Sequence, residues 1–260
     1  MGLSVITNTT AASSSRMLNI IHAKTQDSLM RLSTGKRINK PSDDAGGLAV
    51  STKISAAIRR NSAVQNNVSN AISMLQTQDG ALETYGSILE RMSELKMLSQ
   101  DVTKGDTDKN NYNTEFVQLK SQLANLKNET FNNVSLFGRA LGAVAITEDG
   151  GQSVTLGTVT LEAFSAATLG DFDVSTAKTQ IENIATYRAT NGASSNRLQY
   201  ALDMLSINKV NLEAANGRIL DTDIASESTQ FAKLQILSQA NSAMLSQANM
   251  LPQAALRLIQ

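Results

Sequence analysis

The chain has 260 residues with 23 basic and 23 acidic side chains, so its formal net charge is zero. A chain without net charge has no field that draws it to nucleic acid or to an anionic membrane surface, and we expect neither partner. Cysteine is absent and histidine occurs once, at His22, which excludes disulfides, cysteine nucleophiles and histidine-based metal clusters.

A catalytic function finds little support in the residue types present. A single histidine does not form the paired-histidine motif of a zinc protease, and a serine triad would have to recruit His22. The run Asp44-Ala45-Gly46-Gly47 lacks the lysine of a phosphate-binding loop. We therefore expect no catalytic residues, no cofactor and no metal ion, and interpret the chain as a non-enzyme.

Residues 1–42 are interpreted as one amphipathic helical segment. Its main apolar side chains recur at helical spacing: Leu18, Ile21, Leu29 and Leu32. Thr, Ser and Asn fill the first turns and are poor helix formers, so we expect weak order in an isolated monomer. Gly35 predicts the helix end, and Ser42 or Asp43 is expected to cap the next helix. The first six residues lack the basic-then-apolar order of a cleaved signal peptide.

The stretch from Val64 to Met92 has a strict heptad pattern. Its small or apolar side chains recur in steps of four and three: Val64, Val68, Ala71, Leu75, Leu82, Leu89 and Met92. Gln78 and Tyr85 occupy the two remaining stations. Such a seam packs against a partner helix in a coiled coil. No proline interrupts residues 45–101, so the pattern predicts one long helix there.

The middle of the chain is expected to return along this helix and then change period. Residues 104–111 form a turn-rich loop, and a second heptad follows at Tyr112, Phe116, Leu119, Leu123 and Leu126. Residues 132–142 are expected to be irregular. Alternating apolar residues near 143–162, around the turn Glu148-Asp149-Gly150-Gly151, predict a small β-hairpin or a three-stranded patch.

Helical spacing returns in the last 80 residues. It is strongest at Leu198, Leu202, Leu205, Leu212 and Ile219, with Asn191-Gly192 as a kink or helix break. Asp221-Thr222-Asp223 offers caps for a final helix, and Pro252 is expected to end or kink it. We place the apolar seam of this final helix at Leu234, Leu237, Met244, Ala248, Leu251, Ala255 and Leu258, with Asn241 between. The polar residues of its charge-free run argue against a membrane span.

The fold class that follows is mainly α: a long antiparallel helical bundle with a small β-hairpin insert and paired terminal helices. We predict three regions, residues 1–42, 43–220 and 221–260. The first and last are lone amphipathic helices that would pair with each other and with other chains.

Several spaced motifs give this layout a family resemblance. The first is Leu32-Ser33-Thr34-Gly35-Lys36-Arg37-Ile38-Asn39, followed by Asp43-Asp44-Ala45-Gly46-Gly47-Leu48-Ala49. At the other end stand Gly192-Ala193, Asn196-Arg197-Leu198, Gln235-Ile236-Leu237, Gln247-Ala248-Asn249 and Pro252-Gln253. In this order, over essentially the whole chain, they resemble bacterial flagellin in a minimal form without large outer domains.

The resemblance implies a structural subunit exported by the flagellar type III apparatus, without a cleaved signal peptide, and polymerised into the extracellular filament. It implies self-assembly through the terminal helices at Leu18, Ile21, Leu29, Leu32, Leu234, Leu237, Met244, Leu251 and Leu258. Partners implied are an export chaperone, cap proteins and hook-associated proteins. Two alternatives stay open: a hook–filament junction protein, which shares these end motifs, and a soluble coiled-coil adaptor, which explains only the heptads.

One further motif is similar to a recognition segment of the family. Residues 89–95 match the place where many flagellins read LQRVREL, the segment recognised by the animal innate receptor for flagellin. Leu89, Arg91, Glu94 and Leu95 are retained, whereas Glu90 replaces an amide and Ser93 replaces an arginine. The resemblance implies a weakened receptor site added to a packing role for Leu89 and Leu95.

Overall fold

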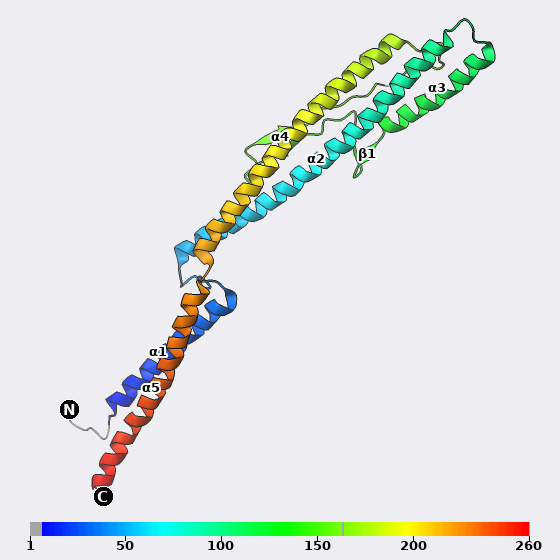
Figure 1. Ribbon diagram of the computed structural model, residues 1–260. Coiled ribbons are helices and arrows are strands. Elements are labelled where there is room, and N and C mark those ends of the chain that lie inside the picture. Colours follow the sequence, from blue (N-terminus) through cyan, green and yellow to red (C-terminus); the bar gives the residue numbers. More distant parts are fainter. Residues whose placement is uncertain (1–6, 163, 260) are drawn as a thin grey trace. The chain divides into compact units, whose positions relative to one another are not determined.

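A computed structural model describes the backbone of residues 7–162 and 164–259, and the side chains of these residues as far as Met250. The first six residues, where no signal-peptide pattern was found, lie outside the described part. The described elements are α1 (Thr9–Thr34), α2 (Ala45–Ser99), α3 (Asp106–Lys127), β1 (Thr130–Phe131), β2 (Val134–Ser135), β3 (Ala143–Ala145), β4 (Ser153–Thr155), α4 (Val174–Leu220) and α5 (Ile224–Ile259) (Figure 1). The predicted mainly α fold is confirmed.

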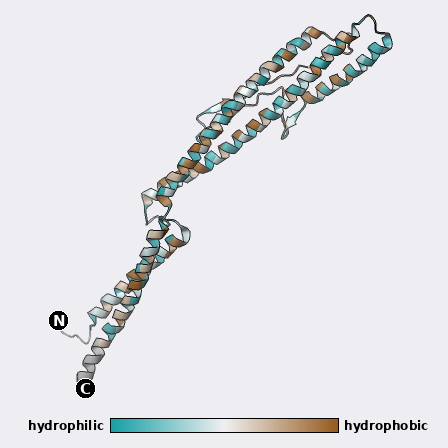
Figure 2. Cartoon of the chain, in the orientation of Figure 1, coloured by the Kyte–Doolittle hydropathy of each residue, from teal (hydrophilic) through white to brown (hydrophobic). Residues whose placement is uncertain are grey.

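The chain divides into two compact units, residues 1–56 with 212–260 and residues 57–211. These limits fall inside α2 and α4, whereas the sequence placed its boundaries at the links before residue 43 and after residue 220. The three predicted regions therefore stay a prediction. Along each helix, hydrophobic residues recur between hydrophilic ones (Figure 2). No described helix is long and apolar enough to cross a membrane.

In the unit of residues 57–211, α2 and α4 run side by side and antiparallel (Figure 1). The predicted α2 seam is buried at Val68, Ala71, Leu75, Leu82, Leu89 and Met92. Helix α3 folds back onto α2 as expected and adds Phe116 and Leu123 to the core around Leu82, Leu89 and Met92. It begins at Asp106, six residues earlier than predicted, because acidic Asp106 and Asp108 suit the positive end of the helix dipole.

The segment between β4 and α4 packs against these helices without forming the third strand that was one of two expectations. Val159 and Leu161 are buried there, and the backbone of this segment is bonded at single points: the Val159 carbonyl accepts from Gly138 N, and lysine and tyrosine side chains reach carbonyl groups further along. Lys96 Nζ donates to the Leu169 and Gly170 carbonyls, and Tyr85 donates to Glu162 O at 2.8 Å. Burial raises the pKa of Tyr85 to about 12.

Two short hairpins complete this unit. Strands β3 and β4 pair antiparallel with Val144 opposite Val154, and Gly150 in their turn has φ 73°, so the predicted hairpin is confirmed. Strands β1 and β2 form a second hairpin in a stretch that was expected to be irregular. Its turn residues Asn132 and Asn133 have φ 48° and 63°, which asparagine tolerates better than most residues. The adjacent asparagines Asn132 and Asn133 are the feature of the sequence that indicates this turn.

Helix α4 continues through Asn191-Gly192, so the predicted break is wrong. The reason is a buried polar contact: Asn191 donates to Gln78 Oε1 at 2.8 Å, and Gln78 donates to the Leu136 carbonyl at 2.5 Å. Gln78, the polar station of the α2 seam, is thus fully buried and bonded on both sides. An amide pair inside an apolar seam specifies the alignment of its two helices, because other alignments leave it unbonded.

The links of the other unit are defined by caps. Gly35 ends α1 at φ 69°, as predicted, and Asp223 caps α5 by accepting from Ala225 N and Ser226 N. The predicted cap at Ser42 or Asp43 is wrong, because Asp44 accepts from Gly47 N at 2.8 Å, while Asp43 accepts from two loop amides that lower its pKa.

Two further details concern the ends of helices in this unit. A side chain at Gly47 would collide with the Asp44 carboxylate and would lie 2.8 Å from Ile38 Cδ1, so this glycine is needed for the cap. Helix α5 continues past Pro252 to Ile259, and the expectation that proline ends it is wrong.

We predict that Gln78→Leu destabilises the chain by about 1–3 kcal/mol for each polar group left unpaired. Adding Asn191→Leu should recover part of this loss, because the second substitution removes one of the orphaned groups. Urea unfolding of the two single variants and the double variant measures the coupling. Strictly additive losses would show that the two amides do not act as a pair.

We also predict that limited proteolysis of the monomer removes α1 and α5 first and leaves a fragment near residues 43–220. The described part of the terminal unit buries few large apolar side chains, chiefly Ile21, Ile38 and Leu234, so local opening there has a small free-energy cost. Mass spectrometry identifies the fragments. Equal resistance of the ends in monomer and polymer would contradict this.

Candidate assembly surface on the terminal helices

Helices α1 and α5 form an antiparallel pair (Figure 1). Near the α5 start, Ser28 Oγ donates to Glu227 Oε1, and Arg31 lies 3.8 Å from the same carboxylate. Near the other end, Asn8 Nδ2 donates to the Ala248 carbonyl at 2.8 Å. These contacts fix the direction and the alignment of the two helices.

The contact between them is a narrow seven-residue seam. Buried side chains recur every seven residues, at Ser14, Ile21 and Ser28 in α1 and at Leu234, Asn241 and Ala248 in α5. Half-buried side chains fill the alternate stations: Ala11, Leu18, Thr25 and Leu32 in α1, and Phe231, Ser238 and Leu245 in α5. Among the predicted residues, Leu18, Ile21, Leu32 and Leu234 therefore lie in the seam. Leu29 does not, since it is 54% exposed.

The predicted register of α5 is wrong at two stations. Ser238 and Leu245 face α1, where the sequence pattern placed Leu237 and Met244. The cause is that α5 has apolar residues on two adjacent sides, and only one side pairs with α1. Leu237 is 39% exposed and Met244 is 56% exposed. The side chains of the other two predicted residues, Leu251 and Leu258, lie outside the described part.

Leu237 and Met244 belong to an exposed apolar flank of the pair. Lys24, Asp27 and Gln230 line one cavity of about 260 Å³ between the helices, which identifies the flank. Met17 and Ile20 lie on the same flank of α1, because each is seven residues before Lys24 or Asp27. Leu237 and Met244 lie on the same flank of α5, seven and fourteen residues after Gln230.

We call the surface formed by these four side chains, Met17, Ile20, Leu237 and Met244, the outward surface. Met17 is 50% and Ile20 41% exposed, so all four side chains are accessible in the single chain. Exposed apolar side chains gathered on one flank are typical of a contact site for another protein.

The predicted receptor segment lies in the other unit, on α2. Leu89 and Leu95 are buried in the core, while Arg91 and Glu94 face solvent. Arg91 donates from Nε and Nη2 to both carboxylate oxygens of Glu115, at 2.7 and 3.2 Å, and from Nη1 to Glu94 at 2.7 Å. These bonds, first those to Glu115, raise the pKa of Arg91. Glu115 comes from α3, and no local pattern in the sequence connects it with Arg91.

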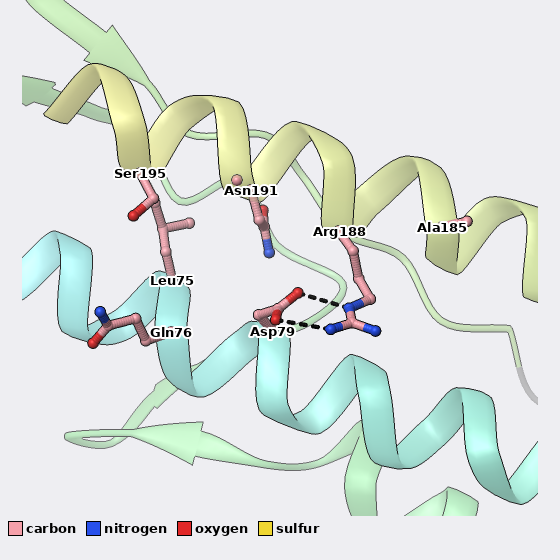
Figure 3. A pocket seen from close by; sticks show the side chains of 8 residues that line it. Leu75, Gln76, Asp79, Ala185, Arg188, Asn191 and Ser195 are labelled. Atoms are coloured by element: carbon pink, nitrogen blue, oxygen red, sulfur yellow. Dashed lines mark hydrogen bonds and ion pairs between the residues drawn. The ribbon is translucent and has the colours of Figure 1, made fainter. Parts of the chain in front are cut away.

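A groove of about 560 Å³ also opens between α2 and α4, bordered by Leu75, Gln76, Ala185 and Gly192 (Figure 3). From one helix to the other, Arg188 of α4 forms a two-point ion pair with Asp79 of α2, at 2.9 and 3.2 Å. The groove holds no pairing of nucleophile and base. Among the described residues, no group of histidine, aspartate or glutamate side chains is arranged to hold a metal ion.

Residues 5–140 match the bacterial flagellin N-terminal helical region, and residues 174–259 match the bacterial flagellin C-terminal helical region. A flagellin of Halalkalibacterium halodurans is 34% identical over 97% of this chain and 98% of its own length. A flagellar filament core protein of Brachyspira hyodysenteriae is 33% identical over 97% of this chain and 98% of its own length. A crystal structure of Bacillus cereus flagellin matches 56% of this chain and 88% of its own, with 25% identity and a TM-score of 0.39.

The matches at both ends place the chain in a class of structural proteins that polymerise into filaments. The two family matches at the ends, together with relatives similar over nearly the whole length, make the assignment specific: the chain belongs to the bacterial flagellin family. It is a structural subunit of the extracellular flagellar filament, and the soluble adaptor and junction-protein alternatives are not favoured.

Proposed function

We propose that the subunits polymerise through the outward surface of the terminal helices. The observation that supports this is the exposure of Leu237 and Met244 beside Met17 and Ile20, on a helix pair whose own seam is already filled. A second copy that covers these side chains removes apolar area from water. Each large side chain so buried contributes about 1.5–3 kcal/mol.

The contact is expected to be heterologous, so that one copy offers this surface and the next copy covers it with a different one. A heterologous contact whose rotation does not close builds an open helical polymer. The terminal helices are also the part with the fewest buried large apolar side chains, so neighbours would order them at the moment of assembly. Leu251 and Leu258 stay predicted members of this contact.

Several finer features of the function are part of the same proposal. The chain is exported through the flagellar type III apparatus and meets an export chaperone, the cap and hook-associated proteins, as family membership suggests. It acts without catalysis, because one histidine and no cysteine leave few nucleophile–base pairs to build.

We propose in addition that Arg91 and Glu94 contribute to recognition by the animal innate receptor. Support comes from their exposure and from the Glu115 carboxylate, which holds the Arg91 guanidinium in a fixed orientation by two hydrogen bonds. A side chain fixed in advance loses less conformational entropy when a partner binds. Leu89 and Leu95 act only through packing, since both are buried.

We predict that Leu237→Asp/Met244→Asp abolishes polymerisation and leaves the chain folded. The exposed side chains accept a carboxylate in the single chain, whereas an interface that covers them would bury two unpaired charges. The critical concentration for polymerisation should rise at least ~100-fold, because each loss of about 1.4 kcal/mol in association free energy raises it tenfold. Sedimentation after seeding measures it, and thermal circular dichroism checks the fold.

A matched control is Gln235→Asp/Ser242→Asp, which places two carboxylates seven residues apart on exposed stations of the other flank of α5. This control should polymerise nearly as the parent does. Normal pelleting of Leu237→Asp/Met244→Asp would show that the outward surface faces water in the filament.

We predict that Arg91→Ala lowers receptor activation by the monomer several-fold, while Arg188→Ala leaves it unchanged. Arg188 is a matched control because it also forms a two-point ion pair with a carboxylate between two helices, in the same unit. A reporter-cell titration provides the measurement. If both variants match the parent, Arg91 has no receptor role.

A further inference from the structure

Three successive layers on the central stations of the α1–α5 pair alternate between polar and apolar. Because the helices are antiparallel and each is buried every seven residues, the Ser28–Glu227 contact aligns the remaining layers. It places Ile21 opposite Leu234, and Ser14 opposite Asn241. The hydrogen bond from Asn8 to the Ala248 carbonyl, at the far end, agrees with this alignment. In sequence the three layers are polar, apolar and polar.

We propose that this alternation is a register code, and that Glu227 and Asn241 are positioning residues that select one alignment of α5 on α1. The code matters for assembly only on the basis of the proposed function, since the outward surface combines residues of both helices. In a seam with so few large apolar side chains, packing alone discriminates weakly between alignments one heptad apart.

A shift of one heptad shows what the code opposes. Such a shift moves α5 along α1 by about 10.5 Å, at 1.5 Å per residue. Ile21 then meets Asn241, and Ser28 meets Leu234, so each layer joins a polar group to an apolar one. Asn241 keeps the hydrogen bond from its Nδ2 to the Leu237 carbonyl of its own helix in either register, but the shift places its amide against Ile21. Ser28 loses its bond to Glu227, and a polar group buried against an apolar side chain is costly.

The shift also separates Glu227 from its partners. In the observed alignment this carboxylate accepts from Ser28 and lies within 3.8 Å of Arg31, although its side chain is only 13% exposed. After the shift it would remain in the first turn of α5 without either contact. The shifted state therefore lacks one hydrogen bond and one ion pair that stabilise the observed alignment.

The half-buried stations discriminate less. The same alignment pairs Thr25 with Phe231, Leu18 with Ser238, and Ala11 with Leu245, so each of these layers combines a larger and a smaller side chain. A shift of one heptad would instead pair Leu18 with Leu245 and Thr25 with Ser238, so these stations do not oppose the shift. The register is therefore set mainly by the buried stations and by the contacts of Glu227.

The alignment has a direct consequence for the outward surface. It places Leu237 level with Leu18, beside Met17, so that apolar side chains of both helices adjoin. A one-heptad shift would place Leu237 beside Lys24 instead. A subunit in the wrong register would thus present a charge in the middle of the surface through which it assembles.

Cross-linking tests the code directly, because the full-length chain contains no natural cysteine. The pair Lys24→Cys/Gln230→Cys reports the observed register, since both residues line one cavity. The pair Lys24→Cys/Leu237→Cys reports the register shifted by one heptad. With a short bismaleimide and dilute, unassembled chain, we expect only the first pair to react in the otherwise unchanged protein.

The variant Glu227→Leu/Asn241→Leu makes the layers nearly equivalent in both registers. We expect cross-linking of the shifted-register pair to increase at least ~10-fold in this background, as the population of that state rises. Asn241→Leu alone, which keeps the Glu227 contacts, should give a smaller increase. Circular dichroism verifies that each variant retains its helices, and the single variant provides the test if the double variant does not.

The matched control is Thr229→Leu/Ala243→Leu, which adds two leucines at the same spacing on exposed stations of α5. It should cross-link only in the observed register. Exclusive reaction of the observed-register pair in Glu227→Leu/Asn241→Leu, or equal reaction of both pairs in the parent, would overturn the code. Because the chains are unassembled, the result does not depend on whether polymerisation uses the outward surface.

Discussion

Antiparallel pairing along a seven-residue seam is the constraint on which this protein depends. A single helix cannot bury its own apolar stripe, so each long helix here needs another one beside it. Helix α2 finds α4 and α3, with a segment of irregular backbone tied on by Lys96 and Tyr85. Helix α1 packs against α5. The seam is narrow in every case, and most of each helix surface is left for solvent or for other chains.

Polar residues inside the seams are the second common feature. Gln78 with Asn191 and Ser14 with Asn241 stand where a stability-driven coiled coil would place leucine. Such residues lower the apolar area that is buried, but they make wrong alignments costly. Gln78 and Asn191 would lose their mutual hydrogen bond, and Ser14 and Asn241 would each be placed against an apolar side chain. For a subunit that must match many identical copies, a single alignment is worth more than additional stability.

The sequence predicted those parts of the fold that depend on local patterns, and it missed those that depend on contacts between residues far apart in the chain. The α2 seam from Val68 to Met92, the Gly35 stop and the β3–β4 hairpin follow from local periodicity and turn chemistry, and the structure confirms them. The continuity of α4 at Asn191-Gly192 depends on a partner 113 positions away in the chain, and the role of Glu115 depends on another helix. Interactions of that range leave no local pattern.

The register of α5 is an instructive failure. Two sets of stations, one through Leu237 and Met244 and one through Ser238 and Leu245, share Leu234, Asn241 and Ala248, and both have acceptable heptad spacing. The sequence pattern favoured the set with larger side chains, which is the usual choice for a helix with one buried side. The α1 helix instead covers the set with the smaller side chains, so the larger ones stay exposed.

That outcome has a physical logic for a subunit that assembles. Burying Leu237 and Met244 within the chain would strengthen the single subunit. Covering Ser238 and Leu245 instead leaves Leu237 and Met244 exposed, which favours association if the subunits assemble through the outward surface as proposed. Apolar patterning that is ambiguous along one helix is therefore expected wherever that helix has one partner in its own chain and another in a neighbouring copy.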